Sequence, residues 1–263
     1  MRREPIVLFD NGSHQCLMFD DLVSGEGVQS NQFLITDHEQ YLLLDPGGDL
    51  TYTPLSLELS KHIPVQALTY IFASHQDPDI IASLDKWLLH TRARVICSKL
   101  WARFLPHLTA NYLALSHGIC TYDRIIALPD RGQSIPLGKC TLKAVPAHFM
   151  HSEGNFQFYD PVSKILFSGD MGASLVDHSQ AAQPVRDFDD HVLTMIGFHR
   201  RYMISNKICR FWVNMVRQLD VEMIVPQHGC RFEGKVMVNR FLDWIETLQC
   251  GVDLMTQSNY RAP

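Results

Sequence analysis

The sequence lacks several features that would assign a function at once. No stretch approaches the roughly 20 consecutive apolar residues of a membrane-spanning helix, and the basic residues are scattered through a chain of net charge -5. We therefore expect neither membrane insertion nor nucleic-acid binding, and look instead for a small ligand or a protein partner. The chain also has no GxSxG, GxGxxG or Walker motif. Their absence disfavours a serine hydrolase and a protein that binds its own nucleotide or flavin.

The cysteine pattern does not indicate a disulfide framework. There are seven, an odd number, widely spaced and without a CxxC pair, which argues against a disulfide scaffold or a structural zinc knuckle. We expect reduced thiols and a cytoplasmic protein. The apolar segment Pro5–Phe9 is shorter than the roughly 7 to 15 residues of a signal sequence, so the mature chain is expected to start here. No linker or low-complexity run divides the chain, which predicts one domain over residues 1–263.

Apolar runs alternate with helical periodicities along the whole chain. Strands are predicted at Phe33–Thr36, Tyr41–Leu44, Leu68–Ala73, Arg94–Cys97, Arg124–Leu128, Cys140–Pro146, Phe156–Tyr159, Ile165–Phe167 and Met223–Val225. Helices are predicted at Leu55–His62, Ile80–Thr91, Lys99–Leu115, Phe188–Leu219 and Lys235–Gln249. Two strand-rich halves, each accompanied by helices, predict an α+β fold in which two sheets pack as an αββα sandwich.

Histidine and aspartate follow four of the predicted strands. The segments are FASHQDPDI at residues 72–80, AHFMHSEGN at 147–155, SGD at 168–170 and PQHG at 226–229. Each segment alone is weak, because a single HxDxD is more often a solvated turn than a site. Four such strand ends in this order form a pattern, since a buried strand that ends in a polar cluster is a common way to present metal ligands or catalytic groups.

The pattern resembles the metallo-β-lactamase superfamily, whose usual motifs are HxHxDH, a His in a GHTPGS-like loop, an Asp in a GD loop and a His in PGHG. The likeness runs from about Gln32 to Gly229, with NQFLI to YLLLDPGG resembling the first hairpin. Two departures are informative. Asp77 stands where hydrolases of the superfamily have a second His, and Ile80 stands where the motif ends in His.

A carboxylate in the middle of the first motif is similar to the flavodiiron branch, which has HxExDH. Residues 230–263 are too few for a flavodoxin domain, so the chain resembles the short relatives of that branch, the oxygen-binding di-iron proteins. The resemblance implies two iron ions. Replacing imidazole by carboxylate favours iron or manganese over zinc on ligand type. Iron is the metal that we expect, and manganese or zinc would also fit the donor set.

The resemblance also implies a role for each ligand. His75, Asp77 and His151 would bind the first metal, Asp79 and His228 the second, and Asp170 would bridge both. A spacing of two in an extended loop would place His75, Asp77 and Asp79 on one side of the backbone. Ile80 in place of the sixth ligand would leave an open position for a small neutral molecule such as O2.

Several histidines leave alternatives open. His148 precedes His151 by three residues and would replace it if the register of the loop differed, although His151 aligns better with the motif. In GFHRRYMISN, residues 197–206, His199 and Tyr202 are candidates for contact with O2 or with a metal ligand, or are ordinary residues of an amphipathic helix. Surface or core positions are expected for His14, His38, His62, His90, His107, His117, His178 and His191. Cys230 is expected to be a buried small hydrophobe.

The leading functional hypothesis is a di-iron protein that binds or reduces O2, or NO. With an external electron donor it would be a reductase. Without one it would be a sensor read by a partner such as a chemotaxis receptor, and the missing flavodoxin domain favours the sensor. The second hypothesis is a zinc hydrolase in which a metal-bound hydroxide attacks the substrate. The third is a fold kept for protein interaction, with Phe188–Leu219 forming a homodimer contact.

Overall fold

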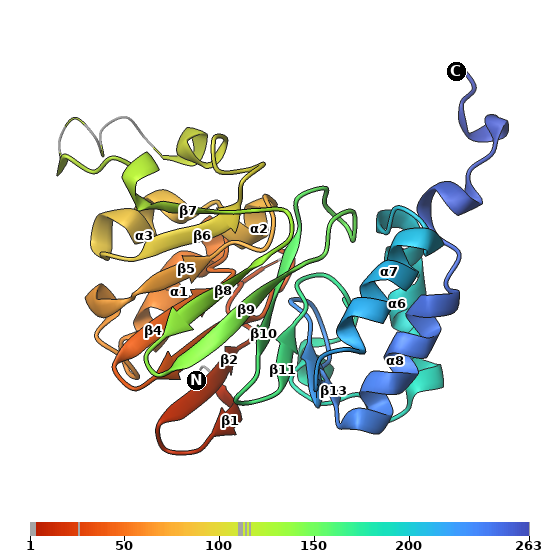
Figure 1. The fold of residues 1–263 in the computed structure, drawn as a ribbon, viewed down its shortest axis with the longest axis horizontal. Coiled ribbons are helices and arrows are strands. Elements are labelled where there is room, and N and C mark those ends of the chain that lie inside the picture. The colour runs from red at the N-terminus through yellow and green to blue at the C-terminus, as the bar shows by residue number, and fades with distance from the viewer. Residues whose placement is uncertain (1–3, 26, 110–112, 114, 116, 263) are drawn as a thin grey trace. The chain divides into compact units, whose positions relative to one another are not determined.

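The computed structural model describes residues 4–25, 27–109, 113, 115 and 117–262 (Figure 1). It divides into two compact units, each built from two stretches of sequence. Unit 1 contains residues 1–146 and 154–163, and unit 2 contains residues 147–153 and 164–263. The single domain expected from the sequence stays a prediction.

A seven-stranded sheet forms the centre of unit 1 within the described residues. Its strands lie in chain order: β1 (Ile6–Asp10), β2 (His14–Phe19), β3 (Gln32–Asp37), β4 (Gln40–Leu44), β5 (Tyr70–Phe72), β6 (Arg94–Ser98) and β7 (Ile125–Leu128). β1 to β4 pair antiparallel and β4 to β7 pair parallel. Parallel neighbours require crossover connections. These connections carry α1 (Asp49–Leu59), α2 (Pro78–Ile81) and α3 (Leu84–His90).

Successive side chains of a strand point to opposite faces of the sheet. The apolar strands of this sheet therefore present apolar side chains on both faces, and both faces are covered by other elements. On one face, Leu43 and Ile71 share a core cluster with Trp87 of α3, and Figure 1 shows the helices of unit 1 along this sheet. The other face packs on the antiparallel strands β8 (Gln133–Leu137), β9 (Cys140–Pro146) and β10 (Phe156–Asp160). There the rings of Phe72 and Phe158 lie 4.5 Å apart between centroids.

Unit 2 combines four described helices with a short piece of sheet. β11 (Ile165–Phe167) pairs parallel with β12 (Met223–Val225), which pairs antiparallel with β13 (Phe232–Glu233). The helices of this unit are α5 (His178–Ala181), α6 (Phe188–Tyr202), α7 (Asn206–Val216) and α8 (Lys235–Thr247). The Phe241 ring of α8 stacks on Phe232 with centroids 4.5 Å apart.

The remaining helical segments are short 3-10 turns, and no described helix has the length and apolar character that crossing a membrane requires. These turns are η1 (Val65–Ala67), η2 (Leu105–Leu108), η3 (Tyr122–Arg124), η4 (Gly251–Leu254) and η5 (Gln257–Asn259).

The mixed class and every strand predicted from the sequence are confirmed, with ends that differ by at most two residues. The hairpin predicted over residues 33–44 is confirmed as the β3–β4 pair, but the antiparallel pair of β1 and β2 precedes it in the chain. These two strands, β8 and β13 were not predicted. Their burial patterns are irregular or mix exposed with buried positions, so a simple reading of apolar alternation does not find them.

The helix predictions need more correction. Lys99–Leu115 is not one helix: up to Thr109 the described chain forms turns and η2, and residues 110–112 and 114 lie outside the described part. Phe188–Leu219 is broken into α6 and α7, and Ile80–Thr91 into α2 and α3. The first of the five predicted helices, Leu55–His62, starts earlier, at Asp49, and ends at Leu59. In each broken helix the interruption coincides with hydrogen bonds to another part of the same unit.

Candidate metal centre

The first ligand segment leaves the sheet of unit 1 at the end of β5. The backbone N–H of Ser74 donates to the Asp45 carboxylate at 2.8 Å, which fixes the chain one residue before His75. His75 is 2% exposed, and its Nδ1 lies 2.9 Å from Ser74 Oγ. Its Nε2 lies 3.7 Å from Asp77 Oδ2. The imidazole is therefore oriented through one nitrogen while the other faces a carboxylate.

The extended loop expected through His75, Asp77 and Asp79 is only partly correct. Asp77 has extended backbone angles and is the N-cap of α2, but Asp79 lies in the first turn of that helix. Pro78 is the first helical residue, a position that suits proline because the first backbone donors of a helix have no partner within it. The three side chains therefore do not follow a simple alternation.

Ile80, the residue in place of the sixth ligand, packs into the core of unit 1. It is 0% exposed and shares the apolar cluster with Leu84 and Trp87. Its carbonyl accepts a hydrogen bond from Gly47 at 2.9 Å, and Ser83 Oγ donates to the Gly47 carbonyl at 2.6 Å. The Pro46–Gly48 turn is thus bonded to α2 and to the break between α2 and α3. An apolar residue at this position is explained by packing alone.

In unit 2, Asp170 and His228 come together because β11 and β12 are parallel neighbours. The loops that leave the carboxyl ends of two parallel strands emerge at the same edge of the sheet. Hydrogen bonds join these loops directly: Gln227 donates to the Gly169 carbonyl at 2.7 Å, and Ser174 donates to the His228 carbonyl at 3.1 Å. These bonds hold Asp170 and His228, two of the ligand candidates, close to each other.

The loop that carries His151 has a strained backbone. His151 has φ +80° and Phe149 has φ +64°, values that non-glycine residues adopt at a cost of about 1–3 kcal/mol each. The loop is held by an antiparallel bridge between Met150 and Met203, and Ile204 donates to the Phe149 carbonyl at 3.2 Å. These contacts also explain why the predicted long helix is interrupted after Tyr202.

The Asp170 carboxylate lies between two imidazoles of unit 2. Its Oδ2 is 3.4 Å from His151 Nε2, and its Oδ1 is 3.6 Å from His228 Nε2. Both separations exceed the usual range of an N–H···O hydrogen bond. They match the spacing of two donor atoms that each lie about 2.0–2.2 Å from one cation. Since each oxygen faces a different imidazole, the carboxylate has the arrangement of a bridge between two ions.

The donor set fits iron. The side chains of His151, Asp170 and His228 are 10%, 6% and 15% exposed, so they are sheltered yet not closed off from a small ligand. Imidazole and carboxylate together, without a thiolate, are donors typical of non-haem iron and manganese centres. His75 and Asp77 of unit 1 offer the same pair of donor types.

His199, a sequence candidate for contact with O2, is fully buried with both ring nitrogens engaged. Its Nδ1 donates to the Met195 carbonyl at 2.9 Å, and its Nε2 accepts from the Gly172 N–H at 3.0 Å. Burial lowers the pKa of His199 to about 4, so the ring is neutral at pH 7 and Nε2 is able to accept. His199 therefore anchors the turn that follows Asp170.

Replacing His199 by Phe is expected to leave the buried Gly172 N–H without an acceptor, while the aromatic ring fills most of the volume. We expect the free energy of unfolding of the metal-free protein to fall by about 1–3 kcal/mol, measured by urea denaturation. The exposed neighbour Arg200 is the control, and its replacement by Ala should change stability by less than about 0.5 kcal/mol. Equal stability of wild type and the His199→Phe variant would contradict the anchoring role.

Tyr202, the second such candidate, is half exposed at the end of α6. Its ring lies edge-on to His151 with centroids 5.0 Å apart and stacks on Phe198 at 4.7 Å. His148 lies partly buried in the same loop as His151, but it is His151 whose Nε2 faces Asp170. The supporting residues Ser74, Asp45 and Gly172 were not singled out from the sequence, because nothing in their local pattern reveals a hydrogen bond to a distant loop.

A family model described as "ODP family beta lactamase" matches residues 28–229. The solved structure called "Peroxy diiron species of chemotaxis sensor ODP" is 39% identical, with a TM-score of 0.83 over 96% of this chain and 98% of that one. The apo state of chemotaxis sensor ODP from T. denticola is also 39% identical, with a TM-score of 0.81 over 95% and 97% of the two chains. The metallo-β-lactamase fold expected from the sequence is confirmed.

More distant relatives extend beyond this chain. A putative diflavin flavoprotein A 4 of Synechocystis sp. is 37% identical over 84% of this chain, and an uncharacterised protein of Methanocaldococcus jannaschii is 25% identical over 83%. The chain spans 36% and 53% of their respective lengths. The Flv1 flavodiiron core from Synechocystis sp. PCC6803 shares the fold, with 16% identity and a TM-score of 0.72 over 93% of this chain and 62% of that one.

Proposed function

The chain belongs to the ODP family of β-lactamase-fold proteins, and on that premise we propose that it is a non-haem di-iron protein that binds O2 and signals the bound state to a protein partner. The Asp170 carboxylate, with one oxygen toward each of two imidazoles, is the observation that carries this proposal. Two iron ions held there would supply reversible binding of O2 or NO. The chemotaxis sensor named among the related structures supports a receptor as partner.

We propose the ligand set that the sequence resemblance implies. His75, Asp77 and His151 bind one iron, Asp79 and His228 bind the other, and Asp170 bridges them. Two observations support this set. In unit 1, His75 Nε2 faces the Asp77 carboxylate, and in unit 2 the imidazoles of His151 and His228 face the Asp170 carboxylate. Asp77 supplies a carboxylate where the zinc hydrolases have imidazole, which favours the di-iron protein over the hydrolase.

The protein's own contribution to signalling begins at His151. Its ring contacts Phe198 and Tyr202 of α6, with centroids 5.6 and 5.0 Å away, and its loop is bridged to Met203. A change in the position of His151 is therefore transmitted to the end of α6, where Tyr202 reaches the surface of unit 2. We propose that Tyr202 orients His151, and that a partner reads this end of the helix.

Anaerobic loading with ferrous iron, followed by metal analysis and admission of air, tests the proposal. We expect about two irons per chain and a visible absorption band that appears in air and disappears on reduction. Zinc retained in preference to iron, with no band, would contradict the proposal and favour the hydrolase. Rapid multiple turnover of O2 with an external donor would instead identify a reductase.

Location and assembly complete the proposal. The seven cysteines are free thiols, in keeping with a reducing compartment, and we propose a cytoplasmic protein. The homodimer predicted from the sequence remains to be measured, and light scattering of the iron-loaded protein would determine it.

A further inference from the structure

A second cluster of metal-binding side chains lies in unit 1, outside the proposed di-iron centre. His14, Cys16 and Asp160 are 1%, 0% and 0% exposed. His14 Nε2 is 2.7 Å from Asp160 Oδ2, Cys16 Sγ is 3.5 Å from the same oxygen, and Cys16 Sγ is 3.8 Å from His14 Nε2. One imidazole nitrogen, one sulfur and one carboxylate oxygen thus form a small triangle between the two sheets of the unit.

The fold explains how these residues meet. His14 and Cys16 are two positions apart on β2, so their side chains lie on the same face of the strand. That face is turned toward the strands β8 to β10, and Asp160 is the last residue of β10. The Asp160 carboxylate is held in place because Val162 N–H donates to Oδ1 at 3.0 Å and the Ser163 hydroxyl donates to Oδ2.

A further carboxylate orients the imidazole of His14. Asp37 Oδ2 lies 2.9 Å from His14 Nδ1, so that nitrogen donates to the carboxylate and Nε2 is directed at Cys16 and Asp160. Asp37 is itself fixed by the Lys139 N–H at 2.6 Å and by His38 Nδ1 at 2.8 Å. A histidine that binds zinc commonly donates its other ring nitrogen to a carboxylate in this way.

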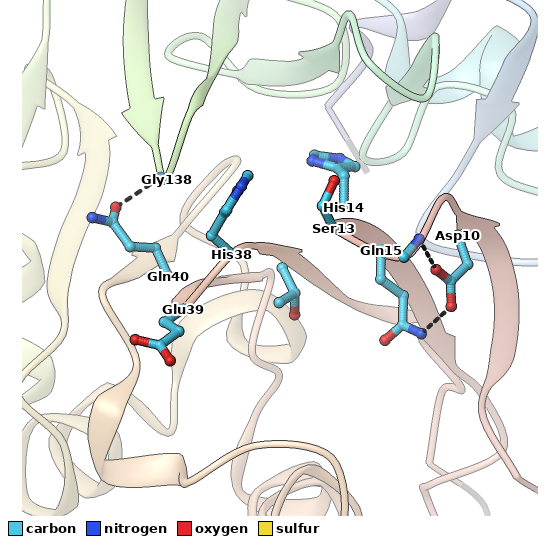
Figure 2. Close-up of a pocket in the computed structure, with 10 residues that line it drawn as sticks. Asp10, Ser13, His14, Gln15, His38, Glu39, Gln40 and Gly138 are labelled. Atoms are coloured by element: carbon cyan, nitrogen blue, oxygen red, sulfur yellow. Dashed lines mark hydrogen bonds between the residues drawn. The ribbon is translucent and has the colours of Figure 1, made fainter.

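The cluster also has an entry path. Figure 2 shows an open cavity of about 790 Å³ whose lining includes Ser13, His14, Thr36, His38 and Gly138. In Figure 2 the side chains of His14, from β2, and His38, from the turn between β3 and β4, extend toward the same side. His14 therefore lines a cavity that opens to solvent, while Cys16 and Asp160 are buried behind it.

We propose that His14, Cys16 and Asp160 bind a zinc ion, independently of the proposed iron centre. Ligands about 2.0–2.3 Å from a tetrahedral zinc lie roughly 3.2–3.8 Å apart, and both distances that involve sulfur already have this value. The nitrogen and oxygen need to separate by about 0.5 Å, as the ion replaces the proton between them. A water from the cavity completes the coordination.

Protons and charges balance in this exchange. Zinc displaces one proton from the His14 imidazolium and one from the Cys16 thiol, and both leave through the cavity. The two positive charges gained with zinc equal the two lost with the protons, so the net charge of the buried cluster is unchanged and no additional charge is buried. The thiolate makes the site selective for zinc over magnesium or calcium, which prefer oxygen ligands.

Cobalt(II) is the probe that distinguishes this site, because a thiolate bound to cobalt gives an intense near-ultraviolet charge-transfer band. The proposed iron ligands are histidine and aspartate only, so they give no such band. With the full chain, loaded with iron and kept anaerobic, we expect the band to saturate at about one cobalt per chain and to be abolished by added zinc. Absence of the band in the wild-type protein would overturn the proposal, whatever the iron content.

Two variants assign the band to these residues. Cys16→Ser should abolish it, whereas Cys97→Ser, at another buried cysteine of the same unit, should leave it unchanged. A band that persists in Cys16→Ser would overturn the assignment. Asp37→Asn should weaken zinc affinity about 10- to 100-fold, the usual effect of losing a carboxylate behind a zinc ligand. Iron content should be unchanged in all three variants.

Discussion

Asp170→Asn is expected to reduce bound iron from about two ions per chain to fewer than one, because the variant loses both the bridging charge and one oxygen donor. In unit 2 the two carboxylate oxygens face two different imidazoles. The amide of asparagine has a single oxygen and no charge, so it serves at most one of the two ions. Metal analysis after anaerobic loading measures the effect directly.

The loss of iron in Asp170→Asn should be accompanied by loss of the absorption change on admission of air. Asp189→Asn, at an exposed carboxylate on α6 that pairs with Arg240, is the matched control and should retain both iron and the band. Retention of two irons per chain by Asp170→Asn would show that this carboxylate does not bridge them.

The variants His151→Ala and His148→Ala are expected to differ strongly in the amount of iron that they bind. His151→Ala should lose at least one iron and the oxygen-dependent band, because removing one imidazole from the four protein ligands proposed for that ion exposes it to exchange. His148→Ala should retain both irons. Iron content and the absorption spectrum, measured side by side, decide between the two histidines that the sequence left open.

His151 lies in a strained loop, so a His151→Gly variant separates the effect on iron binding from the effect on loop conformation. Relief of the positive φ at residue 151 by Gly, which adopts such angles without strain, should keep or raise stability while still removing the ligand. A His151→Gly variant that is folded and loses iron separates ligation from loop geometry. If His148→Ala loses iron and His151→Ala does not, the register assigned from the sequence motif is wrong.

The sequence by itself determined most strands of both sheets, though not β1, β2, β8 or β13, and the residue types of the proposed iron centre. The reason is local: a buried strand is a short apolar run, and the polar residues that follow it within a few positions are fixed relative to its end. FASHQDPDI, SGD and PQHG are each complete within nine residues or fewer. The family resemblance could therefore be drawn from four short segments without knowledge of their packing.

Other features depended on contacts between segments remote in sequence. The helix is interrupted after Tyr202 because Met203 forms a bridge with Met150. The helical periodicity over Phe188–Leu219 is a local pattern and does not reveal this contact. His199 was a candidate for contact with O2 or with a metal ligand, and only the structure shows that its hydrogen bond to Gly172, formed across 27 residues, anchors the turn after Asp170.

The cluster of His14, Cys16 and Asp160 shows the same limit most clearly. His14 and Asp160 are 146 residues apart, and β2 was not predicted, so His14 was expected to be only a surface or core residue. The relative positions of side chains along one strand are set by backbone geometry, so they can be predicted from the local sequence. Which strand end meets another is decided by the pairing and packing of the sheets, and only the tertiary structure placed an imidazole, a thiol and a carboxylate around one point.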